Sequence, residues 1–171
     1  GFTESKECWR DFLSRLKSQG LRGGRVFTGD KAAGMVGSIA EVFPGAKYQC
    51  CTVHFCRNVL AKAPNPSVPG FKAIHAMESR EAASAKAESV ADEFESMRPK
   101  EAAKVVREGF AETLAYCEML LEHWRRIRMN NAIERLNREI RRRTRVVGTF
   151  PDEKSALMLV AARLKYIADS E

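Results

Sequence analysis

The sequence lacks any long, uninterrupted hydrophobic run. No stretch reaches the roughly 20 apolar residues that a membrane-spanning helix requires, and the first ten residues are too polar and charged for a signal peptide. We therefore expect a cytoplasmic protein without a membrane partner. Internal repeats and low-complexity tracts are also missing, and 171 residues are enough to bury a core of ordinary size.

The cysteines are poorly placed for disulfides. The five cysteines are odd in number, and Cys50, Cys51 and Cys56 crowd together, which does not fit a disulfide framework. Cys51 and His54 have a Cys-x-x-His spacing that supplies two zinc ligands, but a closed structural site needs four and no second pair occurs. Zinc binding stays open, and buried thiols beside a locally bonded histidine are the favoured interpretation.

Positive charge exceeds negative charge in this chain. The 29 Lys and Arg residues outnumber the 22 Asp and Glu residues, which gives a net charge of +7 and a pI near 9.3. This balance favours a polyanionic partner, nucleic acid before membrane, over a small-molecule substrate. The alternative is a basic surface of no special function.

Residues 131–145 contain six arginines and no lysine. Ile133, Leu136 and Ile140 recur at helical spacing and predict an amphipathic helix docked on a core. Glu134 stands among the arginines, either as the ion-pair partner of Arg138 or as a metal ligand beside a nucleic-acid backbone. Guanidinium groups suit phosphate oxygens. Together with one arginine that follows the cysteine cluster, the candidate DNA-binding residues are Arg57, Arg135, Arg138, Arg141, Arg142, Arg143 and Arg145.

Residues 24–55 predict a βαβ unit. Strand-like runs at 24–28 and 47–55 flank a helix at 31–43, which gives two parallel strands joined by a helix. Two strands leave open edges, so we expect a partner strand or self-association into a homo-oligomer.

Asp30 directly follows the first of these strands. Open α/β sheets bind ligands at the carboxyl ends of their strands, which makes Asp30 a candidate functional residue. The alternative is that Asp30 caps the helix that follows. Position alone does not separate the two interpretations.

The rest of the chain predicts helices, so the fold class is α/β but mostly helical. A first helix is capped by Thr3 or Ser5, and a hairpin pairs a helix over 79–97 with a second that opens at Pro99. The buried face of that second helix consists of Val105, Val106, Phe110, Leu114, Cys117, Leu120 and Leu121. A last helix follows Asp152, and its core face consists of Leu157, Leu159, Val160, Leu164 and Ile167.

Four blocks carry a family resemblance. They read DKAAGM from Asp30, VFPGA from Val42, QCCTVHFCRN from Gln49 and NAIERLNREIRRRTRVVGTFP from Asn131. Together they resemble the catalytic domain of Mutator-type bacterial insertion-sequence transposases, the IS256 family. The match runs through nearly the whole chain, and its last block is long and specific.

The resemblance implies a DDE transposase with an RNase H-like core and a helical insertion before the final acidic residue. Asp30 then corresponds to the second acidic residue of the triad and Glu134 to the third, and both are metal ligands. Cys51 and His54 match the family's Cys-x-x-His motif, with a structural or DNA-positioning role. Asn131 opens the block that carries the metal ligand and the DNA-backbone contacts.

The domain organisation expected from this resemblance has three parts. Residues 1–56 form a partial RNase H-like α/β segment, residues 57–127 form the helical insertion, and residues 128–171 form carboxy-terminal helices that complete the catalytic core.

The implied chemistry needs these residue types. Phosphodiester cleavage and strand transfer proceed by in-line attack of water or a 3′-hydroxyl, with two Mg²⁺ or Mn²⁺ ions about 3.5 to 4 Å apart. Carboxylate oxygens suit such hard cations. The partners implied are transposon ends and target DNA at the bacterial nucleoid.

This sequence departs from the family pattern in two ways. The family's first catalytic Asp and its amino-terminal DNA-binding region precede Gly1, so we expect a fragment that is inactive alone. Ala32 also stands where the family tends to carry His. Two alternatives remain: an inactive remnant that binds DNA or the intact transposase, and a small zinc-stabilised helical module.

Overall fold

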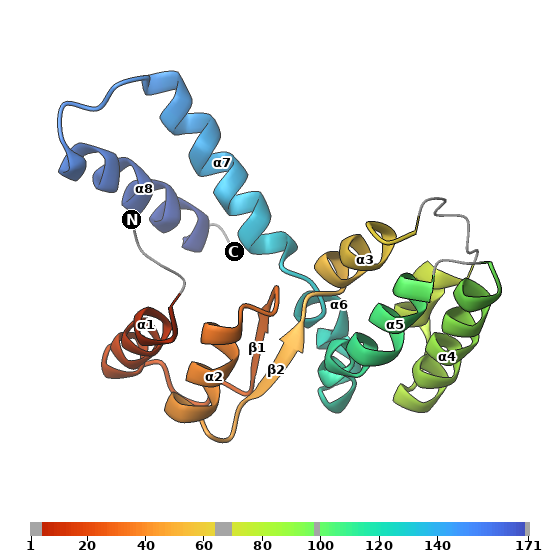
Figure 1. The fold of residues 1–171 in the computed structure, drawn as a ribbon. Coiled ribbons are helices and arrows are strands. Elements are labelled where there is room, and N and C mark those ends of the chain that lie inside the picture. The colour runs from red at the N-terminus through yellow and green to blue at the C-terminus, as the bar shows by residue number, and fades with distance from the viewer. Residues whose placement is uncertain (1–4, 64–69, 98–99, 170–171) are drawn as a thin grey trace. The chain divides into compact units, whose positions relative to one another are not determined.

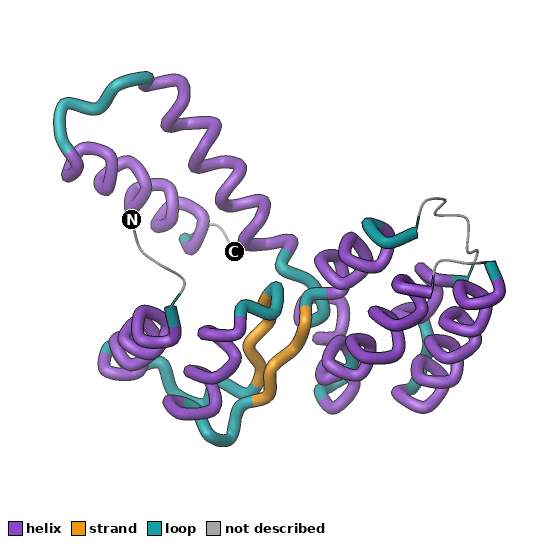
Figure 2. The backbone as a smooth tube through the Cα atoms, viewed as in Figure 1, coloured by secondary structure: helices purple, strands orange, loops and turns teal. Residues whose placement is uncertain are grey.

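The computed structural model describes residues 5–63, 70–97 and 100–169. The chain folds into two compact units, Gly1–Asn130 and Asn131–Glu171. Each unit has its own helices, and the first also holds the sheet (Figures 1 and 2).

A parallel βαβ motif forms the centre of the first unit, as predicted. Strand β1 (Val26–Gly29) pairs with β2 (Lys47–Cys50) in parallel, and helix α2 (Ala33–Val42) connects them. The prediction of a strand to residue 55 is wrong, because helix α3 (Thr52–Leu60) begins two residues after β2. The buried residues of α3 are Thr52, Phe55 and Val59, and this three- and four-residue spacing is that of a helix.

One face of the sheet packs against α1 (Lys6–Ser18) and α2. Ser5 caps α1 by accepting a hydrogen bond from the Cys8 N–H, which confirms one of the two predicted caps, whereas Thr3 lies outside the described residues. The cluster between these helices consists of Leu13, Met35, Ile39, Val42 and Phe43, with Phe27 of β1 and Tyr48 of β2 against it.

The helical hairpin lies on the other side of the sheet (Figure 1). It pairs α4 (Arg80–Ser96), capped by Ser79, with α5 (Lys100–Gly109), while Pro99 lies outside the described residues. These helices, α3 and the 3₁₀ helix η1 (Phe71–Ala76) enclose a core centred on Phe55, Phe71, Val90 and Phe94.

The second hairpin helix is shorter than its hydrophobic pattern predicted. After Gly109 the chain continues as 3₁₀ helices η2 (Phe110–Thr113), η3 (Ala115–Glu118) and η4 (Leu121–His123), then α6 (Trp124–Ile127). Leu120 and Leu121 are exposed, so their assignment to the buried face is wrong. The 3₁₀ turns instead bring the backbone of Thr113 and Tyr116 to the buried side chain of Gln49.

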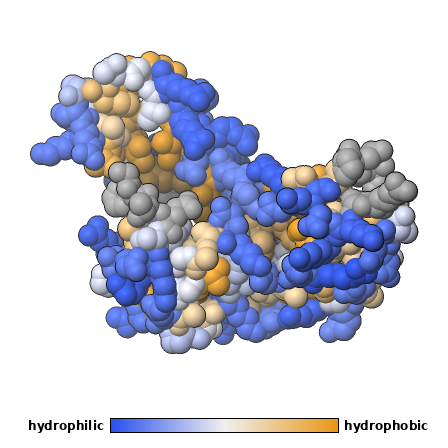
Figure 3. Space-filling model, in the orientation of Figure 1, coloured by the Kyte–Doolittle hydropathy of each residue, from blue (hydrophilic) through white to orange (hydrophobic). Residues whose placement is uncertain are grey.

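The second unit is a pair of helices, α7 (Asn131–Val147) and α8 (Glu153–Ala168). Asp152 caps α8 by accepting a 2.6 Å hydrogen bond from the Ser155 N–H, and Gly148 takes a left-handed φ of +74° where α7 ends. Helix α7 has no buried residue, and Leu157 and Leu164 of α8 are exposed, so those two do not form the predicted core face. Hydrophobic side chains are visible on these helices in Figure 3.

Candidate functional site

Asp30 is exposed and lies immediately beyond the carboxyl end of β1. Helix α2 takes Ala32 as its N-cap and has no side-chain capping bond, so the interpretation of Asp30 as the helix cap is wrong. Asp30 therefore projects from the sheet edge at which α/β proteins bind ligands.

The two neighbours of Asp30 are tightly constrained. A Cβ on Gly29 would lie 2.5 Å from Met35 Cε and 3.4 Å from Tyr48 Cε2, so only glycine fits without movement. Lys31 has a left-handed φ of +71°. Asp30 is thus held between a crowded glycine and an uncommon backbone turn.

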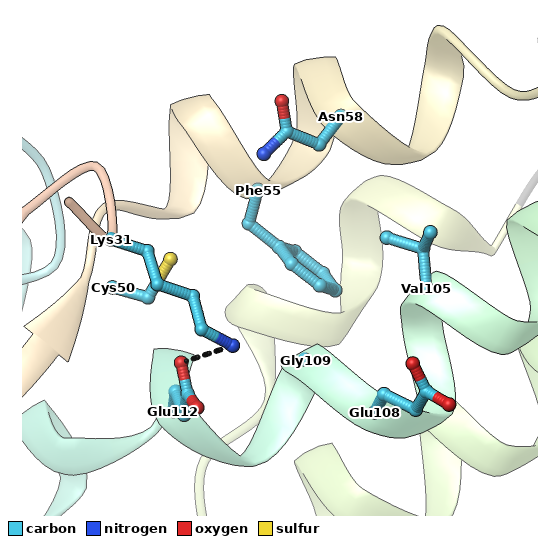
Figure 4. Close-up of a pocket in the computed structure, with 8 residues that line it drawn as sticks. All are labelled: Lys31, Cys50, Phe55, Asn58, Val105, Glu108, Gly109 and Glu112. Atoms are coloured by element: carbon cyan, nitrogen blue, oxygen red, sulfur yellow. Dashed lines mark ion pairs between the residues drawn. The ribbon is translucent and has the colours of Figure 1, made fainter. Parts of the chain in front are cut away.

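The Lys31 side chain reaches across to the segment after α5. Its Nζ lies 2.9 Å from Glu112 Oε2, as Figure 4 shows, and both side chains are about half exposed. The pair borders a cavity of about 200 Å³ lined by Lys31, Cys50, Phe55, Asn58, Val105, Glu108, Gly109 and Glu112. Neither Lys31 nor Glu112 was a candidate from the sequence, because their spacing of 81 positions carries no local pattern.

The chain that leads into α7 is bonded to the same edge of the sheet. Thr28 Oγ1 donates a 2.7 Å hydrogen bond to the Ile127 carbonyl, and the Thr52 N–H donates a 3.0 Å bond to the Arg128 carbonyl. The guanidinium of Arg128 donates to the His75 carbonyl. Residues 127 and 128, just before the arginine-rich helix, are therefore fixed beside the carboxyl ends of β1 and β2.

A buried polar network supports this arrangement. Gln49 Nε2 donates to the carbonyls of Cys50 and Thr113, and Gln49 Oε1 accepts from the Tyr116 N–H. His75 Nε2 lies 2.8 Å from Thr113 Oγ1, and burial, with Arg128 nearby, lowers the pKa of His75 to about 4. Because the Thr113 hydroxyl donates to the Phe110 carbonyl, it accepts from His75.

The Cys-x-x-His pair lies where β2 turns into α3. Cys51 is fully buried at the N-cap position of α3, and His54 is half-buried in its first turn. Burial, with Glu112 nearby, raises the pKa of the neighbouring Cys50 thiol to about 11, so that thiol stays protonated. Within the described residues, no three His, Cys, Asp or Glu side chains are grouped to hold a metal ion.

Arg57 is exposed on α3. It borders a second cavity, of about 360 Å³, to which Thr52, Phe71, His75 and Arg128 also contribute. The side chains of Arg57 and Arg128 thus line one hollow in the first unit.

Helix α7 displays the predicted arginines. Arg135, Arg138, Arg141, Arg142, Arg143 and Arg145 are all exposed. Asn131 is the first residue of the helix, and Glu134 is half-buried in its first turn. Asp30 belongs to the first unit and Glu134 to the second.

Glu139 organises part of the arginine surface. Its Oε1 lies 3.0 Å from Arg142 Nη2, 3.0 Å from Arg143 Nε and 3.4 Å from Arg163 Nη2 of α8. Hydrogen bonds from Arg142 and Arg143 lower the pKa of Glu139 to about 2. Glu139 was not a candidate from the sequence, although its i+3 and i+4 arginines are the signal that could have identified it.

The described part of the chain contains no helix long and apolar enough to cross a membrane.

Comparison with known proteins identifies the family. The model of the Mutator family of transposases matches residues 1–170. The transposase for insertion sequence element ISRM5 of Rhizobium meliloti is 38% identical over 164 residues, which cover 93% of this chain and 41% of the relative.

Other relatives agree. The transposase for IS1081 of Mycobacterium tuberculosis is 36% identical over 160 residues, 91% of this chain and 38% of that protein. The transposase for IS256 in transposon Tn4001 of Staphylococcus aureus is 31% identical over 171 residues, 97% of this chain and 44% of that protein. The chain thus spans about two-fifths of the length of these relatives, and it belongs to the Mutator family of transposases.

Proposed function

We propose that this chain supplies two acidic residues, Asp30 and Glu134, to metal-dependent DNA cleavage and strand transfer in transposition, and that its βαβ unit is part of an RNase H-like core. The observation that carries the proposal is the exposed Asp30 at the carboxyl end of β1, on the sheet edge to which residues 127 and 128 are bonded. Two residues separate Arg128 from Asn131, the first residue of α7, and Glu134 follows in the first turn of that helix.

The donor set fits a hard divalent cation. Asp30 and Glu134 offer carboxylate oxygens, the ligands that Mg²⁺ and Mn²⁺ prefer. When bound, such ions stabilise the attacking and leaving oxygens of an in-line phosphoryl transfer. In this proposal Asp30 and Glu134 hold the metal, and the exposed side of the sheet edge admits the DNA strand.

The arginines of α7 hold the DNA backbone in this proposal. Arg135, Arg138, Arg141 and Arg145 are exposed cations on one helix, and guanidinium groups bind phosphate oxygens without reading bases. Arg57 adds a cation on α3. The names of the relatives, all transposases for insertion sequences, support DNA as the substrate.

The decisive test is whether one metal ion is bound by Asp30 and Glu134 together. A chain of 19.2 kDa is suited to NMR, in which bound Mn²⁺ broadens nearby amide signals. We expect Mn²⁺ to broaden the signals of residues around both Asp30 and Glu134, and we expect Asp30→Asn or Glu134→Gln to abolish both effects. Glu122→Gln, an exposed change in η4, is the control.

Broadening around only one of the two residues, or broadening that survives Asp30→Asn, would overturn the shared site. DNA binding without any Mn²⁺ response would instead support the inactive remnant. In a complete transposase that contains this chain, Glu134→Gln should abolish strand cleavage and leave DNA binding nearly intact.

A further inference from the structure

Lys31 has an uncommon backbone conformation for its residue type. Its φ of +71° is the single positive φ at a non-glycine residue in the described ranges. A Cβ makes the left-handed region unfavourable, so such residues persist only where their surroundings enforce the conformation, and they gather at functional sites.

Neighbouring elements enforce the turn at Lys31. The ion pair with Glu112 joins it to η2, which comes from a distant part of the sequence (Figure 4). The ring of Tyr48 in β2 lies beside the turn, with Cε2 3.4 Å from the position of a Cβ on Gly29. On the far side of Asp30, Gly29 is closed in by Met35 and Tyr48.

The turn decides where Asp30 lies relative to α2. Helix α2 starts at Ala33, with Ala32 as its N-cap, so the chain reverses between β1 and α2 within Asp30 and Lys31. With a right-handed or extended residue at position 31, the backbone on either side of Asp30 would take another path. The ammonium group of Lys31 forms its ion pair with Glu112.

We propose that Lys31 is a positioning residue for Asp30: its left-handed turn, tied to η2 through Glu112, sets the direction in which the Asp30 carboxylate leaves the sheet edge. This inference rests on the proposed function, because it gives a role to the direction of a metal ligand. The backbone of Lys31 carries the effect, and its ammonium group serves as the tether.

Three substitutions at one position separate the turn from the charge. Lys31→Gly and Lys31→Asn remove the cation but adopt the left-handed conformation readily, whereas β-branched Lys31→Val does not. The measurements are the NMR chemical shifts of Asp30 without metal, the Mn²⁺ affinity and the melting temperature, all on the 171-residue chain.

We expect Lys31→Gly and Lys31→Asn to keep the Asp30 shifts and the Mn²⁺ affinity of the original chain. Lys31→Val should move the Asp30 shifts and weaken Mn²⁺ binding by about ten-fold, which corresponds to the strain of a left-handed β-branched residue. Equal weakening by all three variants would assign the effect to the cation and overturn the proposal. A lower melting temperature for Lys31→Val with unchanged Asp30 shifts would overturn it as well.

Glu112→Gln keeps the test decisive if Lys31→Val does not fold. It removes the tether while residue 31 stays a lysine, which disfavours the left-handed region that Gly and Asn adopt without a tether, so it should shift the Asp30 signals and weaken Mn²⁺ binding in the same direction as Lys31→Val. Unchanged signals would contradict the proposal. If the original chain gives no Mn²⁺ response at Asp30, the metal site fails, while the metal-free Asp30 shifts still decide whether Lys31 positions it.

Discussion

The side-chain amide of Gln49 donates a 2.7 Å hydrogen bond to the carbonyl oxygen of Thr113, 64 positions away. The same amide accepts a 2.9 Å bond from the Tyr116 N–H, and Gln49 is fully buried. One side chain on β2 therefore satisfies two backbone groups of the 3₁₀ segment that follows the hairpin. The path of the chain from α5 to α6 depends on this residue.

Replacing Gln49 with Leu should destabilise the first unit strongly. The change leaves the Thr113 carbonyl and the Tyr116 N–H buried without their partner, and each such group costs about 1–3 kcal/mol. We expect a loss of about 2–5 kcal/mol in the free energy of unfolding, measured by urea denaturation. Gln19→Leu, an exposed change at the end of α1, should have almost no effect. Equal stabilities of the two variants would mean that Gln49 does not hold the 3₁₀ segment.

His75 should make the stability depend on pH. Its folded-state pKa of about 4 lies below the ordinary value of 6.5, so the unfolded chain binds the proton first as pH falls. Stability from this group is fully present above pH 6.5 and is lost as pH falls toward 4, by about 3 kcal/mol in all.

The check is urea denaturation at a series of pH values. His75→Gln should remove most of the pH dependence between 4 and 6.5, whereas His123→Gln, at an exposed histidine, should keep it. A pH profile that His75→Gln leaves unchanged would assign the dependence to other groups.

Gly29→Ala should be destabilising because there is no room for a methyl group. The added Cβ would meet Met35 Cε at 2.5 Å, so the end of the buried Met35 side chain must move out of the core cluster that it fills. Overpacking of this kind costs about 1–3 kcal/mol. Gly45→Ala is the matched control, since a Cβ there meets nothing within 4 Å.

A double variant tests the cause. Gly29→Ala combined with Met35→Ala should be less destabilising than the sum of the two single changes, because the shortened side chain makes room for the new methyl group. Strict additivity of the three free energies of unfolding would show that the contact with Met35 is not the reason.

The sequence was most informative where local chemistry decides the structure. The βαβ motif, the Ser5 cap and the α4–α5 hairpin follow from spacing and capping that act over a few residues. The family resemblance, confirmed by the comparisons, came from blocks of residues rather than from periodicity. The location of Asp30 beyond a strand was also predictable, because strand and turn signals adjoin there.

Other features depend on contacts between distant segments. The hydrophobic spacing after Gly109 continues as if the helix did, yet Gln49 and His75 draw Thr113 into a 3₁₀ segment. The ion pair of Lys31 with Glu112 also joins residues that are far apart in the sequence. No local rule relates such partners, so they could not be found from the sequence alone.

Glu139 should restrain DNA binding by α7. It engages Arg142 and Arg143, so Glu139→Gln should release both guanidinium groups toward phosphates, raise DNA affinity and steepen its dependence on salt. In the Glu139→Gln background, where Arg142 is released, Arg142→Ala should weaken binding to all sequences alike and reduce the salt slope by about 0.9.

Fluorescence anisotropy with duplex DNA over a range of salt concentrations measures both effects. Arg107→Ala is the control, because that arginine of α5 is already paired with Glu88, Asp92 and Glu95 and should not contribute to the slope. A slope that does not respond to Arg142→Ala would remove this residue from the DNA contact.

The hydrogen bond from Thr52 to Arg128 joins the first residue of α3 to the segment just before α7. The segment between them, the hairpin included, therefore begins and ends at backbone positions that are bonded to each other. A change in the length of the α4–α5 hairpin would therefore leave the Thr52–Arg128 hydrogen bond, and with it the start of the segment that leads into α7, where it is.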